Sequence, residues 1–310
     1  MVLAVGEILV DVFIDEQNNE SIFPGGAPFN VASNMTLFGN DVSFYGAIGN
    51  DKYGELLSNY ASKKNFKNLK LLKLDSYHTS KAIVTLNNGE RDFKFDRDLG
   101  ADYRLDFNTF KSFDFSKINI VHFGSLMISH QIGRDLLNEM ISYLKNNTNC
   151  KISFDVNYRS DIFASINESK KYYLSIIPHV DILKITTDEL EILTDTKDIV
   201  KGLSLIANKN AFVCLTDGSN GSYYFYKNVL KHIPTYKVKP VDTTGAGDAF
   251  YSYVLSSFDK KDYSLLNEDE LKEIFINANI VGGLTTLKKG AIDSCPTEDE
   301  ILKFKHDVKQ

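Results

Sequence analysis

Cysteine is scarce in this sequence of 310 residues, which contains only Cys150, Cys214 and Cys295. An odd number of widely separated cysteines forms neither a disulfide framework nor a paired CxxC metal site. We therefore expect three structural thiols in a protein of a reducing compartment.

Long charged runs and long apolar runs are missing as well. The formal net charge is −6 and no run of lysine or arginine interrupts it, which argues against nucleic acid or an anionic membrane as the main partner. No apolar stretch approaches the ~20 residues that span a bilayer, so an integral membrane protein is not expected. The first residues lack the basic segment and the cleavage site of a signal peptide. We expect a cytoplasmic location.

Several catalytic and nucleotide-binding patterns are absent. No G-x-x-x-x-G-K-[ST] segment occurs, so a nucleotide site must have another design. The six histidines, at positions 78, 122, 130, 179, 232 and 306, are scattered. They predict neither a metal cluster nor a Ser/His/Asp set, and a hydrolase would therefore lack its parts.

What is present is the composition of an ordinary folded protein. Hydrophobic residues make up 43% and charged residues 25%, close to the average for soluble domains. Short apolar β-rich runs alternate with amphipathic helical stretches, which predicts a mainly parallel sheet with helices on both faces. The expected strands are residues 2–10, 42–48, 118–123, 151–156, 180–185 and 211–215. The expected helices are residues 53–64, 132–145, 169–177, 188–193, 246–258, 268–287 and 297–304. Since no flexible linker or repeat divides the chain, we expect a single α/β domain over residues 1–310.

One region departs from this alternation. Residues 81–86 and 91–96 flank an Asn88-Gly89 pair and have alternating faces, which predicts a β-hairpin. With a segment near the N-terminus, this hairpin predicts a small antiparallel lid, formed by residues 12–24 and 80–104, that closes over a substrate. The alternative is an edge hairpin without such a role.

The segment from Asp242 to Asp248 carries the strongest chemical signal. Gly245, Ala246 and Gly247 directly precede an apolar helical stretch, so their backbone N–H groups would gather at a helix N-terminus and form an anion hole. Phosphoryl transfer from ATP to an alcohol needs such donors and a base for the hydroxyl proton, which Asp248 can supply. Alternatively, Asp248 only favours the helix start through the helix dipole. A dinucleotide-binding turn is discounted because a phenylalanine stands where its third glycine is needed.

Residues 242–248 resemble the C-terminal signature of the ribokinase-like (PfkB) carbohydrate kinase family, and residues 25–32 resemble its N-terminal sugar-binding signature. Residues 49–54 are similar to the G-x-D-x-x-G element that follows. Two long motifs in the right order are far less expected by chance than either alone. The resemblance covers nearly the whole chain. It implies a ribokinase-like α/β fold, with a central mainly parallel sheet and a small antiparallel β lid, and ATP-dependent phosphorylation of a small sugar.

The resemblance also implies roles for individual residues. Asp248 would activate the primary hydroxyl of the sugar, while the N-terminal turn Gly245-Ala246-Gly247 would stabilise the transferred phosphoryl group. Sugar hydroxyls would be bound by Asp11, Gly25, Gly26 and Asn30. The nucleotide would be bound by Thr216, Gly218, Gly221, Thr244, Asn279, Gly290 and Ala291. If the resemblance is set aside, each of these residues has a simpler interpretation. Asp11 would be a turn residue at the end of a strand, residues 216–221 would form an ordinary β-turn, and Asn279 would only contribute to helix packing.

Two metal sites are implied in the same way. Glu189 matches the glutamate of a family N-x-x-E element that organises Mg²⁺ and its waters, although Thr186 stands in the asparagine position. We expect altered metal tuning and not loss of the site. Without the family, Glu189 is a solvated charge on a helix face. A potassium site would be formed by Asp242, Thr244, Thr285, Lys288, Gly290 and Ser294, several of them through backbone carbonyls.

Three features resemble fructokinases and favour fructose as the sugar: the Ala27-Pro28 pair, the charged run that ends at Arg97, and Gly100-Ala101-Asp102 after it. Residues 155–159 resemble an F-D-x-N-x-R element shared with 2-keto-3-deoxygluconate kinases, whose acidic sugar would suit Arg97 or Arg159. Either arginine could instead form a surface salt bridge. The alternatives are therefore this sugar acid, another sugar or a nucleoside as substrate, and an inactive sugar-binding relative. By analogy with the family, the lids of two chains would form a homodimer.

Overall fold

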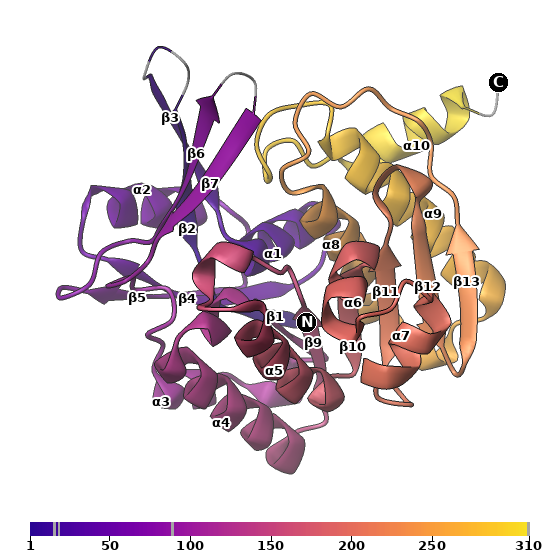
Figure 1. Ribbon diagram of the computed structural model, residues 1–310, viewed down its shortest axis with the longest axis horizontal. Coiled ribbons are helices and arrows are strands. Elements are labelled where there is room, and N and C mark those ends of the chain that lie inside the picture. Colours follow the sequence, from indigo (N-terminus) through magenta and orange to yellow (C-terminus); the bar gives the residue numbers. More distant parts are fainter. Residues whose placement is uncertain (15–16, 18, 88–89, 309–310) are drawn as a thin grey trace.

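A nine-stranded sheet forms the centre of the protein, whose computed structural model describes residues 1–14, 17, 19–87 and 90–308 (Figure 1). Its strands are β1 (Val2–Val5), β4 (Val42–Gly49), β5 (Asn68–Leu74), β8 (Ile120–Phe123), β9 (Lys151–Asp155), β10 (Ile182–Thr186), β11 (Phe212–Thr216), β12 (Ser222–Tyr226) and β13 (Val229–Ile233). In space their order is β13-β12-β11-β10-β9-β8-β1-β4-β5. Neighbouring strands are parallel from β5 to β11, while β12 and β13 pair antiparallel. The expected mainly parallel sheet is confirmed.

Helices cover both faces of this sheet, also as expected. They are α1 (Ala27–Leu37), α2 (Lys52–Ala61), α3 (Phe107–Lys111), α4 (Gln131–Asn147), α5 (Ile166–Ile176), α6 (Thr187–Thr194), α7 (Ile199–Ile206), α8 (Ala246–Lys260), α9 (Glu268–Thr285) and α10 (Glu298–Asp307). One hydrophobic core forms between the sheet and α4, α5, α6 and α7, and a second forms between the sheet and α1, α2, α8 and α9. A sheet covered on both faces needs strands that are apolar on both sides, and every residue of β4 is buried. Within the described residues, no helix combines the length and the apolar character that crossing a bilayer requires.

The expectation of one strand over residues 2–10 is wrong. β1 ends at Val5, and Gly6 has a φ of 143° before β2 (Leu9–Ile14) begins in a second sheet. A side chain at Gly6 would be strained in this conformation, and its Cβ would lie 3.0 Å from Pro28 Cγ. The apolar run continues across this point, so its hydrophobicity conceals the change of sheet. The sequence also did not predict α1, α3, α7 or β5.

The second sheet contains the order β3-β2-β6-β7, with β3 (Glu20–Gly25), β6 (Lys81–Asn87) and β7 (Glu90–Asp96). It stands off the large sheet at the upper left of Figure 1. The pairs β2–β3 and β6–β7 are antiparallel, which confirms the expected small antiparallel sheet, and a parallel β2–β6 pairing joins the two hairpins. The expected Asn88-Gly89 turn lies outside the described residues. Closure of this sheet over a substrate stays a prediction.

Candidate active site

The carboxyl ends of three central parallel strands lie beside the N-terminus of α8. Asp155, Thr186 and Thr216 are the last residues of β9, β10 and β11. α8 packs on the same strands through Tyr251, whose hydroxyl donates to the carbonyl of Ile182 at 3.2 Å. In open α/β proteins this edge of the sheet is where ligands bind.

α8 begins directly after Gly245, in the turn for which the sequence predicts an anion hole. Gly245 has a φ of 77°, in the left-handed region, and a Cβ there would lie 2.5 Å from the Cα of Ala291. A side chain is therefore excluded both by conformation and by space. In the described part of the chain, no side chain caps this N-terminus. The first turn of α8 thus offers backbone donors and the positive end of a helix dipole to an anion.

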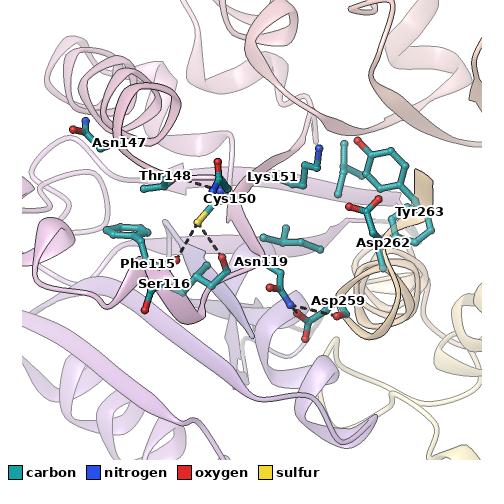
Figure 2. Close-up of a pocket in the computed structure, with 15 residues that line it drawn as sticks. Phe115, Ser116, Asn119, Asn147, Thr148, Cys150, Lys151, Asp259, Asp262 and Tyr263 are labelled. Atoms are coloured by element: carbon teal, nitrogen blue, oxygen red, sulfur yellow. Dashed lines mark hydrogen bonds between the residues drawn. The ribbon is translucent and has the colours of Figure 1, made fainter. Parts of the chain in front are cut away.

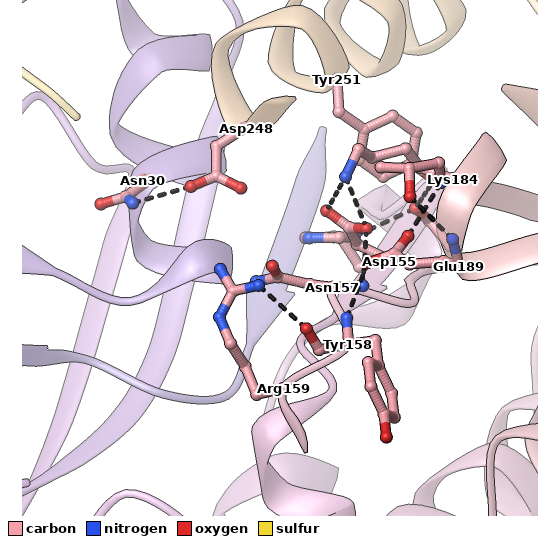
Figure 3. Close-up of polar contacts among 12 residues, drawn as sticks. Asn30, Asp155, Asn157, Tyr158, Arg159, Lys184, Glu189, Asp248 and Tyr251 are labelled. Carbon is pink, nitrogen blue, oxygen red and sulfur yellow. Dashed lines mark hydrogen bonds and ion pairs between the residues drawn. The ribbon is translucent and has the colours of Figure 1, made fainter. Parts of the chain in front are cut away.

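Asp248, the expected base, is held by a residue from the other signature segment. The Nδ2 of Asn30 donates to Oδ2 of Asp248 at 2.8 Å, across 218 positions of sequence (Figure 3). Asn30 is buried in α1, which starts after Gly26, and Gly26 has a φ of 107° with no room for a Cβ against the carbonyl of Glu7. Burial raises the pKa of Asp248, while Asn30 and the positive charges of Lys184 and Arg159 lower it.

Asp11, the expected sugar ligand, faces the same space from β2. Burial, and then the charge of Asp248, raise its pKa to about 7, and Arg159 acts in the opposite direction. Gly25 ends the neighbouring strand β3, and a Cβ at Gly25 would overlap the carboxylate of Asp11. Glycine at this position therefore keeps the Asp11 carboxylate in place. The structure brings Asp11, Asn30 and Asp248 to one site, as the motifs predict.

The two arginines that the sequence nominates for the sugar have different surroundings. Arg159 is exposed and follows β9. Its positive charge lowers the pKa of Asp11 and of Asp248. Arg97 is 4% exposed, and its guanidinium donates to Asp102 at 2.5 and 3.1 Å, to Ser129 Oγ at 3.0 Å and to the carbonyl of Leu126 at 3.1 Å. Arg97 is thus held by protein groups and not by a surface salt bridge. A direct contact of Arg97 with sugar stays a prediction.

The expected nucleotide loop connects β11 to the antiparallel β12. Gly218 and Gly221 have φ values of 50° and 104°, and a Cβ at Gly221 would lie 2.9 Å from the backbone N of Thr235. The backbone conformation of this turn therefore favours glycine at both positions. Asn279 is buried in α9, where its amide donates to the carbonyl of Ile233 at 3.0 Å. Its placement beside adenine and ribose stays a prediction, as does the contact of Thr216 with phosphate.

Asp242 joins the loop before α8 to the loop after α9. Its Oδ1 accepts the N–H of Thr244 at 3.0 Å and its Oδ2 accepts the N–H of Gly290 at 3.2 Å. The hydroxyl of Ser294 donates to the carbonyl of Gly290. Four of the residues expected at a potassium site are thereby brought together, and their oxygen atoms are the donor type that suits a hard monovalent cation.

The other two expected potassium ligands are less directly engaged. Thr285 is buried at the end of α9, and its hydroxyl donates to the carbonyl of Val281 at 2.8 Å. Lys288 is exposed, with its ammonium 3.2 Å from Glu300. Both residues border the loop that Asp242 contacts, but a role in cation binding stays a prediction for each.

Glu189 is not the solvated helix-face charge of the alternative interpretation. It is 8% exposed, its Oε2 accepts the N–H of Thr186 at 2.8 Å, and its Oε1 accepts the N–H of Tyr158 at 2.7 Å. The hydroxyl of Thr186 accepts the N–H of Glu189 in return, which forms a capping box at the start of α6. The carboxylate keeps lone pairs for the waters of a hydrated Mg²⁺, so the residues present fit an outer-shell role.

Two buried ionisable residues at this site, Lys184 and Glu7, have no role in the sequence interpretation, which includes Asp155 only as part of the element at residues 155–159. The ammonium of Lys184, in β10, lies 2.9 and 3.0 Å from the two carboxylate oxygens of Asp155. Glu7 is fully buried, neither of its carboxylate oxygens has a hydrogen-bond partner among the described residues, and burial raises its pKa to about 8. In the sequence, the lysine between apolar residues of the segment that forms β10 was the feature that could have indicated the Lys184–Asp155 pair.

A separate hollow lies at the opposite, amino edge of the sheet (Figure 2). It has a volume of about 590 Å³ and is lined by residues at the starts of β8 and β9 and the end of α8. Some of its polar groups are paired with one another: Cys150 donates to the carbonyl of Ile118 at 3.0 Å and Asn119 to Asp259 at 2.7 Å. None of the described residues that line it belongs to the predicted site, so the chemistry is assigned to the carboxyl edge.

The chain is similar in sequence and in fold to carbohydrate kinases. A family model described as pfkB family carbohydrate kinase matches residues 1–298. The chain is similar to the probable fructokinase-5 of Arabidopsis thaliana, with 34% identity over an alignment of 318 positions that covers 98% of this chain and 97% of that protein.

Two solved structures of a fructokinase from Vibrio cholerae O395 are similar to this structure, each at 29% identity. The form bound to fructose, ADP and calcium has a TM-score of 0.87 and covers 98% of each chain. A double mutant bound to fructose, ADP and potassium has a TM-score of 0.88, with 98% of this chain and 97% of that chain covered.

Proposed function

The chain belongs to the pfkB family of carbohydrate kinases, and from this premise we propose that it transfers a phosphoryl group from ATP to the primary hydroxyl of fructose, giving fructose 6-phosphate. The observation that carries the proposal is the 2.8 Å hydrogen bond between Asn30 and Asp248, which joins the sugar signature to the phosphoryl-transfer signature. A relative at 34% identity and solved structures at 29% identity that are named as fructokinases support this choice of sugar.

The mechanism follows from the geometry of the site. Asp11 and Asn30 orient the sugar, and Asp248 accepts the proton of the attacking hydroxyl. As the bond to the γ-phosphorus forms, the first turn of α8 stabilises the negative charge on the transferred group. Mg²⁺, organised through Glu189 and waters, would supply further positive charge on the phosphates.

Three finer points belong to the same proposal. The oxygen-rich junction formed by Asp242, Thr244, Gly290 and Ser294 supports a bound K⁺ that fixes the loop before α8. Glu189 supports Mg²⁺ in the outer shell. Two chains would associate through the sheet formed by β3, β2, β6 and β7, which closes over the sugar.

A coupled assay of ADP release tests the proposed substrate. Fructose, 2-keto-3-deoxygluconate, ribose and adenosine are each supplied with ATP, and the product is identified by NMR. We expect fructose to have the highest kcat/KM and to give the 6-phosphate. A higher kcat/KM for the sugar acid would replace fructose as the substrate, and no turnover of any of them above the Asp248→Asn variant would overturn the proposal.

A further inference from the structure

The ion pair between Lys184 and Asp155 is buried at the centre of the large sheet. Lys184 is 4% exposed and Asp155 is fully buried. The two residues face each other in the register between β10 and β9, and the ammonium donates to both carboxylate oxygens at 2.9 and 3.0 Å. The adjacent residues Phe154 and Leu183 are apolar and point to the opposite face of the sheet, whereas Ser153 lies on the same face as the pair.

The pair points toward α8. Two residues earlier on the strands, Ser153 and Ile182 are the hydrogen-bond partners of Tyr251, at 2.6 and 3.2 Å. One helical turn back from Tyr251 along α8 is Gly247. A Cβ at Gly247 would lie 3.3 Å from Nζ of Lys184 and 3.4 Å from its Cε. The ammonium therefore lies close to the backbone of the anion-binding turn. Figure 3 shows Lys184 beside Asp155 and Tyr251.

Stability alone does not explain a cation at this place. Removing two charges from water costs several kcal/mol per ion, and a buried pair is often no more stable than apolar residues of similar volume. A positive charge at the N-terminus of a helix also opposes the helix dipole. Both costs are offset when an anion binds in front of the turn, because the ammonium and the dipole then act on it together.

We propose that Lys184 is a positioning residue for phosphoryl transfer, which adds a fixed positive charge behind the Gly245-Ala246-Gly247 turn and keeps Asp248 in its ionised form. The inference rests on the kinase activity proposed above. In the reaction, the sugar oxygen bonds to the γ-phosphorus, the bond from that phosphorus to ADP breaks, and the hydroxyl proton moves to Asp248. Lys184 keeps its proton throughout and Asp155 holds its ammonium in place.

The groups around Asp248 allow this role to be measured. Asn30 of α1 donates a hydrogen bond to Asp248. Asp248 also interacts electrostatically with charged groups from the elements around it: Asp11 in β2, Asp155 in β9, Arg159 after β9, Lys184 in β10 and Glu7 after β1. Burial raises the pKa of Asp248 and Lys184 lowers it, while the charge of Asp248 raises the pKa of Asp11. Although burial opposes the charge on Lys184, the facing Asp155 gives it a net raised pKa, so it is a cation wherever Asp248 titrates.

The experiment compares Lys184→Met, Lys184→Arg and the double variant Lys184→Met/Asp155→Asn with the wild type. We expect kcat of the Lys184→Met variant to fall about 10- to 100-fold, somewhat less than loss of a direct donor in an oxyanion hole, with the KM for each substrate within about threefold. The acid limb of its kcat profile should move to higher pH, because Asp248 loses a neighbouring cation. Lys184→Arg, which keeps the charge, should retain more activity than Lys184→Met.

The double variant distinguishes this role from a structural one, because it removes both buried charges and leaves neither partner unpaired. We expect its thermal stability to recover while its kcat stays as low as that of Lys184→Met. Recovery of kcat together with stability, or an unshifted acid limb, would overturn the proposal. Lys170→Met, which removes a lysine paired with the exposed Asp195, is the matched control and should retain wild-type kcat. Wild-type turnover of fructose tests the proposed function separately, since the Lys184 comparison uses whichever sugar the wild type phosphorylates.

Discussion

Glu7 should make the stability of this protein fall as pH rises through neutrality. The side chain is fully buried, and neither carboxylate oxygen has a hydrogen-bond partner among the described residues. Gly124 lies against it so closely that a Cβ there would overlap Oε2. Burial raises the pKa of Glu7 from 4.5 to about 8, although its own backbone and then Arg97 act in the other direction. The folded protein therefore holds a neutral acid that the unfolded chain would ionise.

The sign and size of the effect follow from proton linkage. Between pH 4.5 and about 8 the folded state binds one more proton at Glu7 than the unfolded state does. Stability is therefore fully present below the unfolded pKa and decreases as pH rises, by about 1.4 kcal/mol per pH unit. Between pH 5 and 7.5 the wild type should lose about 3 kcal/mol relative to Glu7→Gln, whose side chain stays neutral. Asp11 and Asp155 also have raised pKa values, but they are present in both proteins and cancel in the difference.

Urea denaturation at half-unit intervals from pH 5 to 8 measures this difference. The free energy of unfolding of Glu7→Gln minus that of the wild type should increase steadily with pH, whatever its offset at pH 5. Glu55→Gln, which neutralises an exposed acid of α2, is the control and should follow the wild type within a few tenths of a kcal/mol. Parallel curves for Glu7→Gln and the wild type would refute the reasoning, because they would mean that the buried carboxyl is ionised in the folded state.

Further changes at the site have separate expected outcomes. Asp248→Asn should lower kcat by about 10²- to 10⁴-fold without changing the circular dichroism spectrum, since it removes a positioned base. Gly245→Ala should cost at least about 2 kcal/mol in urea denaturation, from the left-handed φ and the contact with Ala291. Gly25→Ala should raise the KM for fructose about tenfold in the coupled assay, because it displaces the carboxylate of Asp11 and costs about one charge-assisted hydrogen bond. Replacing K⁺ by tetramethylammonium at constant ionic strength should lower the rate.

A control variant or a contradicting result is defined for each of these predictions. Gly39 has a φ of 73° and a Cβ there would meet nothing within 4 Å, so Gly39→Ala carries the conformational cost of Gly245→Ala without its contact and should be clearly milder. Equal losses in the two alanine variants would contradict the contact with Ala291. Wild-type turnover in Asp248→Asn, an unchanged KM in Gly25→Ala, or an unchanged rate without K⁺ would each remove the corresponding role.

The sequence predicts most of the central strands and the residues that meet at their carboxyl ends, but it does not predict the path of the first strand. Asp11, Asn30 and Asp248 were each placed by a motif, because glycines with fixed conformations leave local patterns that can be read without a fold. The prediction of one strand over residues 2–10 was wrong, because the hydrophobic run continues across Gly6 while the chain passes from one sheet to the other. Which sheet a strand joins depends on distant partners, and no property of the run itself records it.

Lys184 illustrates a second limit. A lysine between apolar residues can be seen in the sequence, but its value depends on the register that sets it opposite Asp155 and on the face that turns it toward Gly247. Both are tertiary properties. Arg97 shows a related limit, because the charged run that ends at this residue does not reveal that its guanidinium is buried and held by Asp102.

The arrangement of charge favours a neutral sugar over a sugar acid. On the side of the site where the sugar is expected, Asp11 and Asp248 present two carboxylates, and a substrate carboxylate would face both. Of the two arginines that could offset this repulsion, Arg97 is committed to Asp102, which leaves Arg159. On the phosphoryl side, Lys184 and the N-terminus of α8 place positive charge where the transferred group carries its negative charge. A neutral polyol binds such a site through hydroxyl hydrogen bonds to carboxylates and avoids the repulsion, as fructose would.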